Sequence, residues 1–309
     1  MKILLTGGAG FIGSHLLERL IARGDDVAVI DDFNDYYDPA IKRRNLPKSG
    51  FRLLEQDIRN SAELVLREKP DLLVHLAARA GVRPSLRDPA LYESVNVAGT
   101  LGLLEACRQA GVPRVVFASS SSVYGNCPVP FREDEERLEP VSFYGVTKLL
   151  GEHYARVYSR LHGIHITCLR FFTVYGPRQR PDMAIHAFTR SIAEGREIPM
   201  FGDGTTERDY TYISDIIQGI LGAIDHDEPF AVYNLGESRT TTLRRLIELI
   251  GEAVGRAPIV KQMPEQPGDV QRTFASIDQA RARLGYNPGV PVEEGLREFV
   301  RWFRAQTKP

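Results

Sequence analysis

A glycine-rich turn directly follows the first apolar run of the chain, and this feature constrains the fold most strongly. Residues 2–5 have the pattern of a buried strand, and residues 6–13, Thr-Gly-Gly-Ala-Gly-Phe-Ile-Gly, lead into an amphipathic helical pattern. Gly7, Gly10 and Gly13 are spaced for a tight turn, a close approach of the backbone to a pyrophosphate, and close packing of helix on strand. The helix N-terminus would then present free N–H groups to the phosphates. The sequence therefore predicts a dinucleotide-binding strand–turn–helix unit.

An acidic residue at the end of the second strand pattern supports this interpretation. Asp31 directly follows the apolar run at residues 26–30. A carboxylate at this place hydrogen-bonds the adenosine ribose hydroxyls and would repel the 2′-phosphate of NADP, so NAD is the expected cofactor. Asp57 and Ile58 follow the third strand pattern and could flank the adenine. The alternative is a structural glycine turn in an unrelated α/β protein.

Strand and helix patterns alternate over the first 170 residues. Further strands are expected at residues 51–55, 72–75, 114–118 and 165–170, with helical segments such as residues 96–110 between them. Such alternation predicts a parallel sheet with right-handed crossovers. Proline and glycine become more frequent after Gly176, which suggests a second unit.

The predicted fold is therefore α/β, a Rossmann-type doubly wound parallel sheet with a smaller α+β C-terminal substrate domain. Residues 1–172 and about 212–238 are assigned to the NAD-binding domain. Residues 173–211 and 239–309 are assigned to the substrate-binding domain.

Composition excludes several classes of function. The 39 Lys and Arg residues balance 40 Asp and Glu residues, so the chain has no basic footprint for a nucleic acid. No apolar stretch reaches the about 18 residues of a membrane span, and the first apolar run is too short for a signal peptide. A cytoplasmic protein is expected. Cys107, Cys127 and Cys168 lack metal-ligand spacing, so no metal site is expected.

A tyrosine and a lysine at helical spacing are the candidate proton-transfer groups. Tyr144 and Lys148 lie on one face of a predicted helix. A free tyrosine has a pKa near 10 and is a poor base at neutral pH, but a nearby lysine and a cationic nicotinamide favour the phenolate. Four serines, residues 119–122, follow a predicted strand at the sheet edge where such folds bind ligands.

Together these motifs resemble the extended short-chain dehydrogenase/reductase family, and within it the nucleotide-sugar 4-epimerases. The resemblance covers nearly the whole chain. It includes residues 6–13, 75–78, 119–125, 144–148 and 202–210. It implies that Tyr144 is the base, that Lys148 binds the nicotinamide ribose and tunes Tyr144, and that Ser120 bridges the substrate O4 and Tyr144. Ser120 is preferred because it precedes the Val-Tyr-Gly motif by the family's spacing.

The resemblance also implies two sets of binding residues. Those expected to contact NAD are Gly7, Gly10, Phe11, Ile12, Gly13, Asp31, Asp32, Asn34, Lys42, Asp57, Ile58, Leu76, Ala77, Ala78, Arg79, Asn96, Ser119, Tyr144 and Lys148. Those expected to contact a UDP-sugar are Arg83, Ser85, Ser120, Ser121, Ser122, Tyr144, Thr173, Arg180, Met200, Phe201, Arg208 and Asp269. Within the second set, Arg208 would bind the diphosphate and Asp269 would lie near the uridine ribose.

Three segments resemble the UDP-glucuronate 4-epimerases rather than the UDP-glucose enzymes. They are residues 34–39, 80–85 and 173–184. A buried uronate needs donors, because an unpaired buried carboxylate is costly, and Arg180 with Thr173, Ser121 and Ser122 could supply them. The alternative for Arg180 is a surface arginine in a Pro-rich loop. One residue departs from the family pattern: this branch usually has glutamine where Arg79 stands.

The implied reaction is C4 epimerisation of UDP-glucuronate to UDP-galacturonate through a transient 4-keto sugar, with NAD regenerated in each turnover. A UDP-glucose or broad-specificity 4-epimerase is the nearest alternative. Decarboxylases and 4,6-dehydratases of this family carry an acidic residue before Val-Tyr-Gly, whereas residues 120–122 are all serine. A non-catalytic sensor would be expected to lack part of the Tyr–Lys–Ser set. The family also implies a homodimer.

Overall fold

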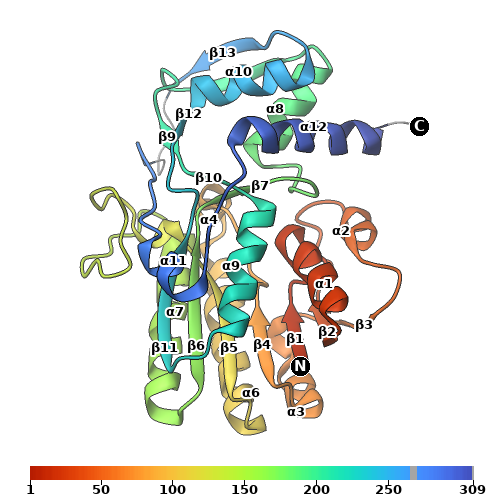
Figure 1. Cartoon of the computed structure of the whole chain (residues 1–309), viewed down its shortest axis with the longest axis vertical. Coiled ribbons are helices and arrows are strands. Elements are labelled where there is room, and N and C mark those ends of the chain that lie inside the picture. The colour runs from red at the N-terminus through yellow and green to blue at the C-terminus, as the bar shows by residue number, and fades with distance from the viewer. Residues whose placement is uncertain (265–269, 308–309) are drawn as a thin grey trace.

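A seven-stranded parallel sheet forms the centre of the molecule in a computed structural model that describes residues 1–264 and 270–307 (Figure 1). The strand order is β11-β6-β5-β4-β1-β2-β3, so the chain runs outward from β1 in both directions. This confirms the predicted doubly wound Rossmann-type fold. The strands are β1 Lys2–Thr6, β2 Asp26–Asp31, β3 Phe51–Glu55, β4 Leu72–His75, β5 Arg114–Ser120, β6 His165–Phe171 and β11 Phe230–Leu235.

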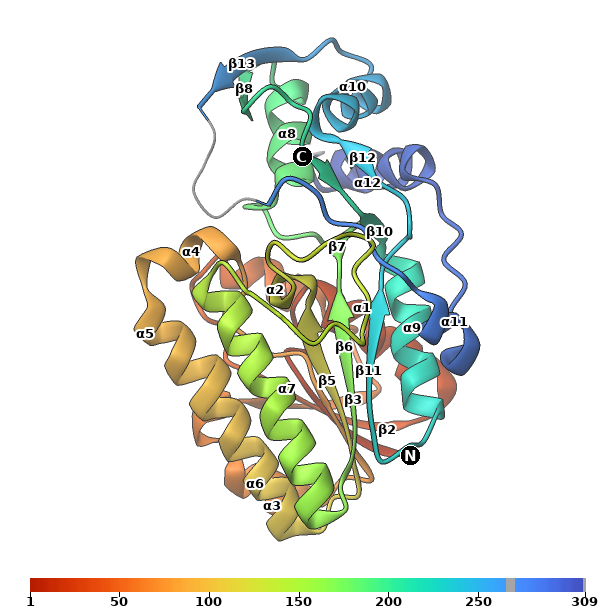
Figure 2. The same ribbon diagram turned by 90° about the vertical axis from the view of Figure 1, so that its left-hand side faces the viewer.

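Helices cover both faces of the sheet because its central strands are apolar on both sides. In β1, Ile3 and Leu5 pack in one hydrophobic cluster and Leu4 packs in the other. Figure 2 shows the two helical layers with the sheet between them. One face carries α1 (Phe11–Arg23) and α9 (Ile213–Asp225). The other carries α3 (Ala62–Glu68), α6 (Thr100–Ala110) and α7 (Phe143–His162).

The helix predicted at residues 96–110 begins before residue 96 in the structure, and its first turns are π-helical rather than α-helical. A π-helical segment, Glu93–Gly99, precedes α6 and places Asn96 toward the loop after β4. π-Helical turns are rare and often occur at functional sites. The remaining short helices are α2 Pro39–Asn45, α4 Val82–Arg87, α5 Pro89–Tyr92, and the 3₁₀ turns Ile58–Asn60 and Ser121–Val123.

A third hydrophobic cluster lies beyond the carboxyl ends of the strands, at the top of Figure 1. It joins α8 (Ala184–Ala193), α10 (Leu243–Val254) and α12 (Val292–Thr307). Small two-stranded sheets accompany these helices: β7 Thr173–Tyr175 with β10 Tyr210–Tyr212, β8 Glu197–Phe201 with β13 Ile259–Met263, and β9 Glu207–Arg208 with β12 Thr241–Thr242.

One segment assigned by sequence to the substrate domain packs against the main sheet. Helix α11 (Asp278–Leu284) carries Ala280, which joins Ile277 and Tyr286 in the core that β1 and α9 share. The Tyr286 hydroxyl donates a hydrogen bond to the Gly236 carbonyl at 2.9 Å, just after β11. The domain boundaries themselves stay a prediction. In the described part of the chain, no helix is long and apolar enough to cross a bilayer.

Candidate active site

A cavity of about 400 Å³ opens at the carboxyl ends of the sheet strands. Its lining residues come from the segments that end or follow β1, β2, β3, β4, β5 and β6. This is the edge at which doubly wound sheets bind ligands. The predicted residues that line it are Gly7, Gly10, Phe11, Ile12, Gly13, Asp31, Asp32, Asn34, Lys42, Asp57, Ile58, Leu76, Ala77, Ala78, Arg79, Ser119, Ser120, Ser121, Ser122, Tyr144, Lys148, Thr173 and Arg180.

The glycine turn leaves room for a diphosphate at the start of α1. A Cβ added to Gly13 would lie 2.1 Å from the Gly7 carbonyl oxygen, so no larger residue fits there. Gly7 itself has φ of +74°, a conformation that favours glycine. Helix α1 has no side-chain cap bond at Gly10 and no acidic residue in its first turn. Its first N–H groups are therefore suited to bind the phosphates of a dinucleotide.

The predicted ribose carboxylate is buried and already partly satisfied. Asp31 accepts hydrogen bonds from the backbone N–H groups of Ala9 and Phe33, each at 3.0 Å. Burial raises the pKa of Asp31, against the effect of these two bonds and of Lys42. Lys42 donates to the Asn34 carbonyl oxygen at 2.8 Å. These bonds fix the carboxylate in place beside the cavity, as a ribose-binding role requires.

The predicted proton-transfer residues come together at the other end of the cavity. Helix α7 starts at an N-cap, Ser142, whose hydroxyl accepts the Gly145 N–H at 3.1 Å. The Lys148 ammonium donates to the Ala118 carbonyl at 2.7 Å and lies 5.9 Å from the centre of the Tyr144 ring. Burial lowers the pKa of Lys148 to about 8, although Glu152 opposes this shift.

The pKa of Tyr144 differs in direction from the sequence-based expectation. Burial raises it, while a hydrogen bond with Ser120 and the charge of Arg180 act to lower it. In the protein alone, burial outweighs these favourable neighbours, so the phenol stays protonated at neutral pH. A cationic nicotinamide in the cavity would favour the phenolate.

The predicted uronate-binding residues line the cavity near Tyr144, but Arg180 is already paired. Its Nε and Nη2 donate to the two carboxylate oxygens of Asp182 at 3.0 and 2.9 Å. Its guanidinium also lies 5.2 Å from the centre of the Tyr36 ring. Within residues 1–264 and 270–307, Asp182 is the only hydrogen-bond partner of this guanidinium. Arg180 is thus held at the cavity rather than in solvent as a free surface arginine.

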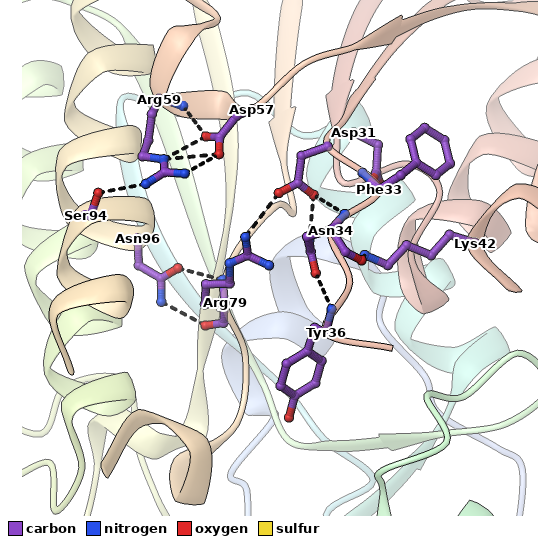
Figure 3. Close-up of polar contacts among 11 residues, drawn as sticks. Asp31, Phe33, Asn34, Tyr36, Lys42, Asp57, Arg59, Arg79, Ser94 and Asn96 are labelled. Atoms are coloured by element: carbon purple, nitrogen blue, oxygen red, sulfur yellow. Dashed lines mark hydrogen bonds and ion pairs between the residues drawn. The ribbon is translucent and has the colours of Figure 1, made fainter. Parts of the chain in front are cut away.

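Two predicted residues act behind the cavity wall. Asn96 is 3% exposed and does not line the cavity. Its side chain accepts the Arg79 N–H at 2.8 Å and donates to the Arg79 carbonyl at 2.9 Å (Figure 3). Ser85 is fully buried, and its hydroxyl donates to the Val82 carbonyl at 2.6 Å. Both side chains position the loop after β4.

Four other residues predicted to contact a UDP-sugar, Arg83, Met200, Phe201 and Arg208, lie outside the cavity lining. The Arg83 guanidinium stacks 4.8 Å from the centre of the Phe201 ring. Met200 is buried beside Phe201 in β8. Arg208 in β9 donates to the Glu207 carbonyl at 2.9 Å. Asp269 lies outside the described residues.

Sequence reasoning missed several residues that line the cavity. Gln56 and Phe172 directly follow β3 and β6, so the rule that ligands bind at strand ends could have found them. Ala118 and Phe171 lie at the carboxyl ends of strand segments as well. Most of the others lie in the segments 34–39, 80–85 and 173–184, which the resemblance singled out without naming these residues as contacts, and only Val95 has no such signal. Besides Gln56 and Phe172, the missed lining residues are Tyr36, Tyr37, Ala80, Gly81, Val82, Val95, Ala118, Phe171, Val174 and Met183.

Comparison with known proteins agrees with this geometry. The model of the NAD dependent epimerase/dehydratase family matches residues 3–236. UDP-glucuronate 4-epimerase 5 of Arabidopsis thaliana is 41% identical over 98% of this chain and 75% of its own length. The structure of the UDP-glucuronic acid 4-epimerase of Bacillus cereus, in complex with UDP-glucuronic acid and NAD, has a TM-score of 0.94 at 37% identity and covers 99% of this chain and 100% of its own. The UDP-glucose 4-epimerase of Thermus thermophilus, in complex with NAD, has a TM-score of 0.90 at 37% identity, with 98% of this chain and 99% of its own covered.

Proposed function

Because the chain belongs to the NAD dependent epimerase/dehydratase family, as an NAD-dependent UDP-sugar 4-epimerase, we propose that it interconverts UDP-glucuronate and UDP-galacturonate. The observation that carries the proposal is the combination of Arg180 with Ser121, Ser122 and Thr173 in the wall of the cavity that holds Tyr144. A guanidinium with three hydroxyl groups suits a carboxylate at C6 better than a hydroxymethyl group.

The proton chemistry is assigned to Tyr144. Tyr144 and Ser120 both line the cavity, and Ser120 acts to lower the pKa of the Tyr144 hydroxyl, so a sugar O4 placed between the two can pass its proton to the phenolate and later recover it. Lys148 is fixed by the Ala118 carbonyl, and its positive charge lies on the Tyr144 side of the cavity. NAD, when bound, supplies the hydride acceptor and donor for C4.

The serine loop before Tyr124 favours epimerisation over related reactions. Loss of CO₂ or water from a 4-keto sugar is promoted by an acid or base near C5 and C6. Ser121 and Ser122 face the cavity at this place and hold no ionisable group. The loop therefore orients a substrate without promoting elimination, while Arg180 holds the carboxylate.

Proton NMR of the purified protein with UDP-glucuronate, and separately with UDP-glucose, tests the proposal. We expect the first to give its C4 epimer with little keto-pentose, and the second to turn over poorly. Turnover of UDP-glucose alone would refute the uronate assignment and leave the 4-epimerase chemistry intact. Accumulation of keto-pentose would refute the role given to the serine loop.

Arg180→Gln is expected to lower kcat/KM for UDP-glucuronate by about 10- to 100-fold, since hydrogen bonds to charged groups contribute about 1.5–3 kcal/mol. The effect on UDP-glucose turnover should be much smaller. Arg178→Gln is the matched control, because Arg178 lies in the same loop and pairs with Glu18 on α1 at 2.5 Å. Steady-state kinetics measure kcat/KM of each variant for both substrates. Equal losses of kcat/KM on the two sugars in Arg180→Gln would contradict a carboxylate-binding role for Arg180.

We also propose that the chain forms a homodimer through the outer face of α7. Apolar side chains are exposed along this helix at helical spacing, and Leu101 of α6 is exposed as well. Figure 2 shows α7 beside α6 at the surface of the molecule. Contiguous exposed apolar side chains of this kind mark interaction sites. On α7 they are Phe143, Val146, Leu150, Val157 and Leu161.

Val157→Asp is expected to convert the dimer to a monomer of 34.6 kDa, because it places a charge in the apolar interface. Val157 is 49% exposed in the single chain, so the substitution should leave the fold intact. Ile259→Asp on β13 serves as the control, since Ile259 is equally exposed outside this face. Light scattering after gel filtration measures the masses. A monomeric parent protein, or a Val157→Asp dimer, would rule this interface out.

A further inference from the structure

We propose that Arg79 and Asp32 form a clasp across the adenosine end of the cofactor cavity, and that this clasp slows the release of NAD. Both side chains line the cavity, Arg79 from the loop after β4 and Asp32 from the loop after β2. The Arg79 Nη2 donates to Asp32 Oδ2 at 3.3 Å. The bond therefore joins the loops that follow β4 and β2, the two strands on either side of β1. The inference rests on the cofactor and is independent of which sugar is bound.

The position of Arg79 is fixed before any ligand arrives. Asn96 binds both the N–H and the carbonyl of Arg79, as Figure 3 shows. Asn96 is itself held by a hydrogen bond of 3.1 Å to the Thr147 hydroxyl, on the helix that carries Tyr144 and Lys148. An exposed ion pair usually contributes little because ordering two long side chains costs entropy. Here the anchored backbone and the partly buried side chains, 15% and 25% exposed, reduce that cost.

A donor of Arg79 is left without a partner inside the site. The Nε–H is buried, and no atom of residues 1–264 and 270–307 accepts a hydrogen bond from it. Leaving a buried donor unpaired is unfavourable. Because Arg79 lines the cavity beside the predicted ribose and adenine residues, an oxygen of the adenosine half of NAD is the fitting acceptor.

A neighbouring ion pair provides the comparison. Arg59 binds the Asp57 carboxylate through Nε and Nη2, with Nε 3.0 Å from Oδ1, and Nη1 binds the Ser94 hydroxyl at 3.1 Å. Arg59 does not line the cavity. Figure 3 shows it bound to Asp57 and Ser94, apart from the bonds of Arg79. Arg79 thus lines the cofactor cavity and Arg59 does not. Each of them pairs with an aspartate that lines the cavity, Arg79 with Asp32 and Arg59 with Asp57.

The test measures the release of radiolabelled NAD from the loaded protein into excess unlabelled NAD, without any UDP-sugar. Arg79→Gln, which restores the residue usual in the family branch, is expected to speed release about tenfold or more. Arg52→Gln is expected to leave the rate unchanged, because Arg52 pairs with Asp26 and Glu68, and none of these three residues lines the cavity. Equal rates for the parent protein and Arg79→Gln would overturn the proposal, and a parent protein that binds no NAD would instead refute the cofactor assignment.

Asp32→Asn separates a clasp from a simple charge effect. If Asp32 acts by holding Arg79, its loss also speeds release, and the double variant releases NAD no faster than Arg79→Gln alone. If Arg79 acts only by its positive charge, removing the nearby carboxylate slows release. Slower release from Asp32→Asn, or fully additive effects in the double variant, would therefore overturn the clasp. Thermal unfolding of each variant shows that its fold is retained.

Discussion

Phe in place of Tyr144 is expected to lower kcat by about 10²–10⁴-fold, the usual contribution of a positioned acid–base group. The phenol is the group at the end of the cavity that can exchange a proton with O4, and Ser120 is placed to share that proton. Phe keeps the ring and its edge-to-face contact with Tyr92, whose ring centre lies 6.3 Å away. The variant should therefore fold and bind NAD as the parent does. Stopped assays of UDP-glucuronate turnover measure the loss of kcat. Circular dichroism and the NAD content of the purified variant show whether folding and NAD binding are retained.

Tyr158→Phe is the matched control for this experiment. Tyr158 lies on the same helix, but its hydroxyl donates to Glu105 at 3.1 Å, away from the cavity. Its loss should leave turnover unchanged. Near-normal turnover by Tyr144→Phe would show that another group removes the O4 proton. Equal losses in the two variants would show that disturbance of α7, rather than loss of a base, explains the result.

Glu152→Gln is expected to destabilise the protein by about 3–5 kcal/mol, since it leaves a buried arginine charge uncompensated. Arg170 and Glu152 are 3% and 5% exposed. Arg170 donates from Nε and Nη2 to the two carboxylate oxygens at 2.9 and 2.8 Å. The Ser119 hydroxyl also donates to this carboxylate. Urea denaturation, read as the free energy of unfolding, measures the change.

The same network explains why the loss should be large. Arg170 Nη1 donates to the Tyr124 hydroxyl at 2.7 Å, and Tyr124 donates to Asn234 at 2.8 Å. The bonds therefore tie the ends of β6 and β11 to α7. Glu105→Gln is the control, because Glu105 pairs with Arg108 at the surface of α6. This variant should leave the urea midpoint unchanged. A change below about 1 kcal/mol for Glu152→Gln, the range of surface pairs, would contradict a buried charge pair.

Much of the cofactor site could be predicted because its determinants are local. The glycines at residues 7, 10 and 13 each fill a place where a Cβ would meet the backbone closely. Strand patterns at residues 51–55 and 72–75 match β3 and β4 residue for residue. The apolar side chains of β4 are buried, whereas Leu53 in the edge strand β3 is exposed. The i, i+4 spacing likewise placed Tyr144 and Lys148 on one face of α7.

The sequence by itself thus determined the individual strands of the sheet, the glycine turn and the Tyr–Lys pair, because each depends on residues close together in the chain. Only the tertiary structure decided that Arg79 meets Asp32, that Asn96 holds Arg79 from behind, and that Glu152 neutralises Arg170. It also decided the direction of the pKa of Tyr144, which burial raises. Contacts between distant segments and the loss of solvent around a charge arise from packing, and no local spacing in a sequence encodes them.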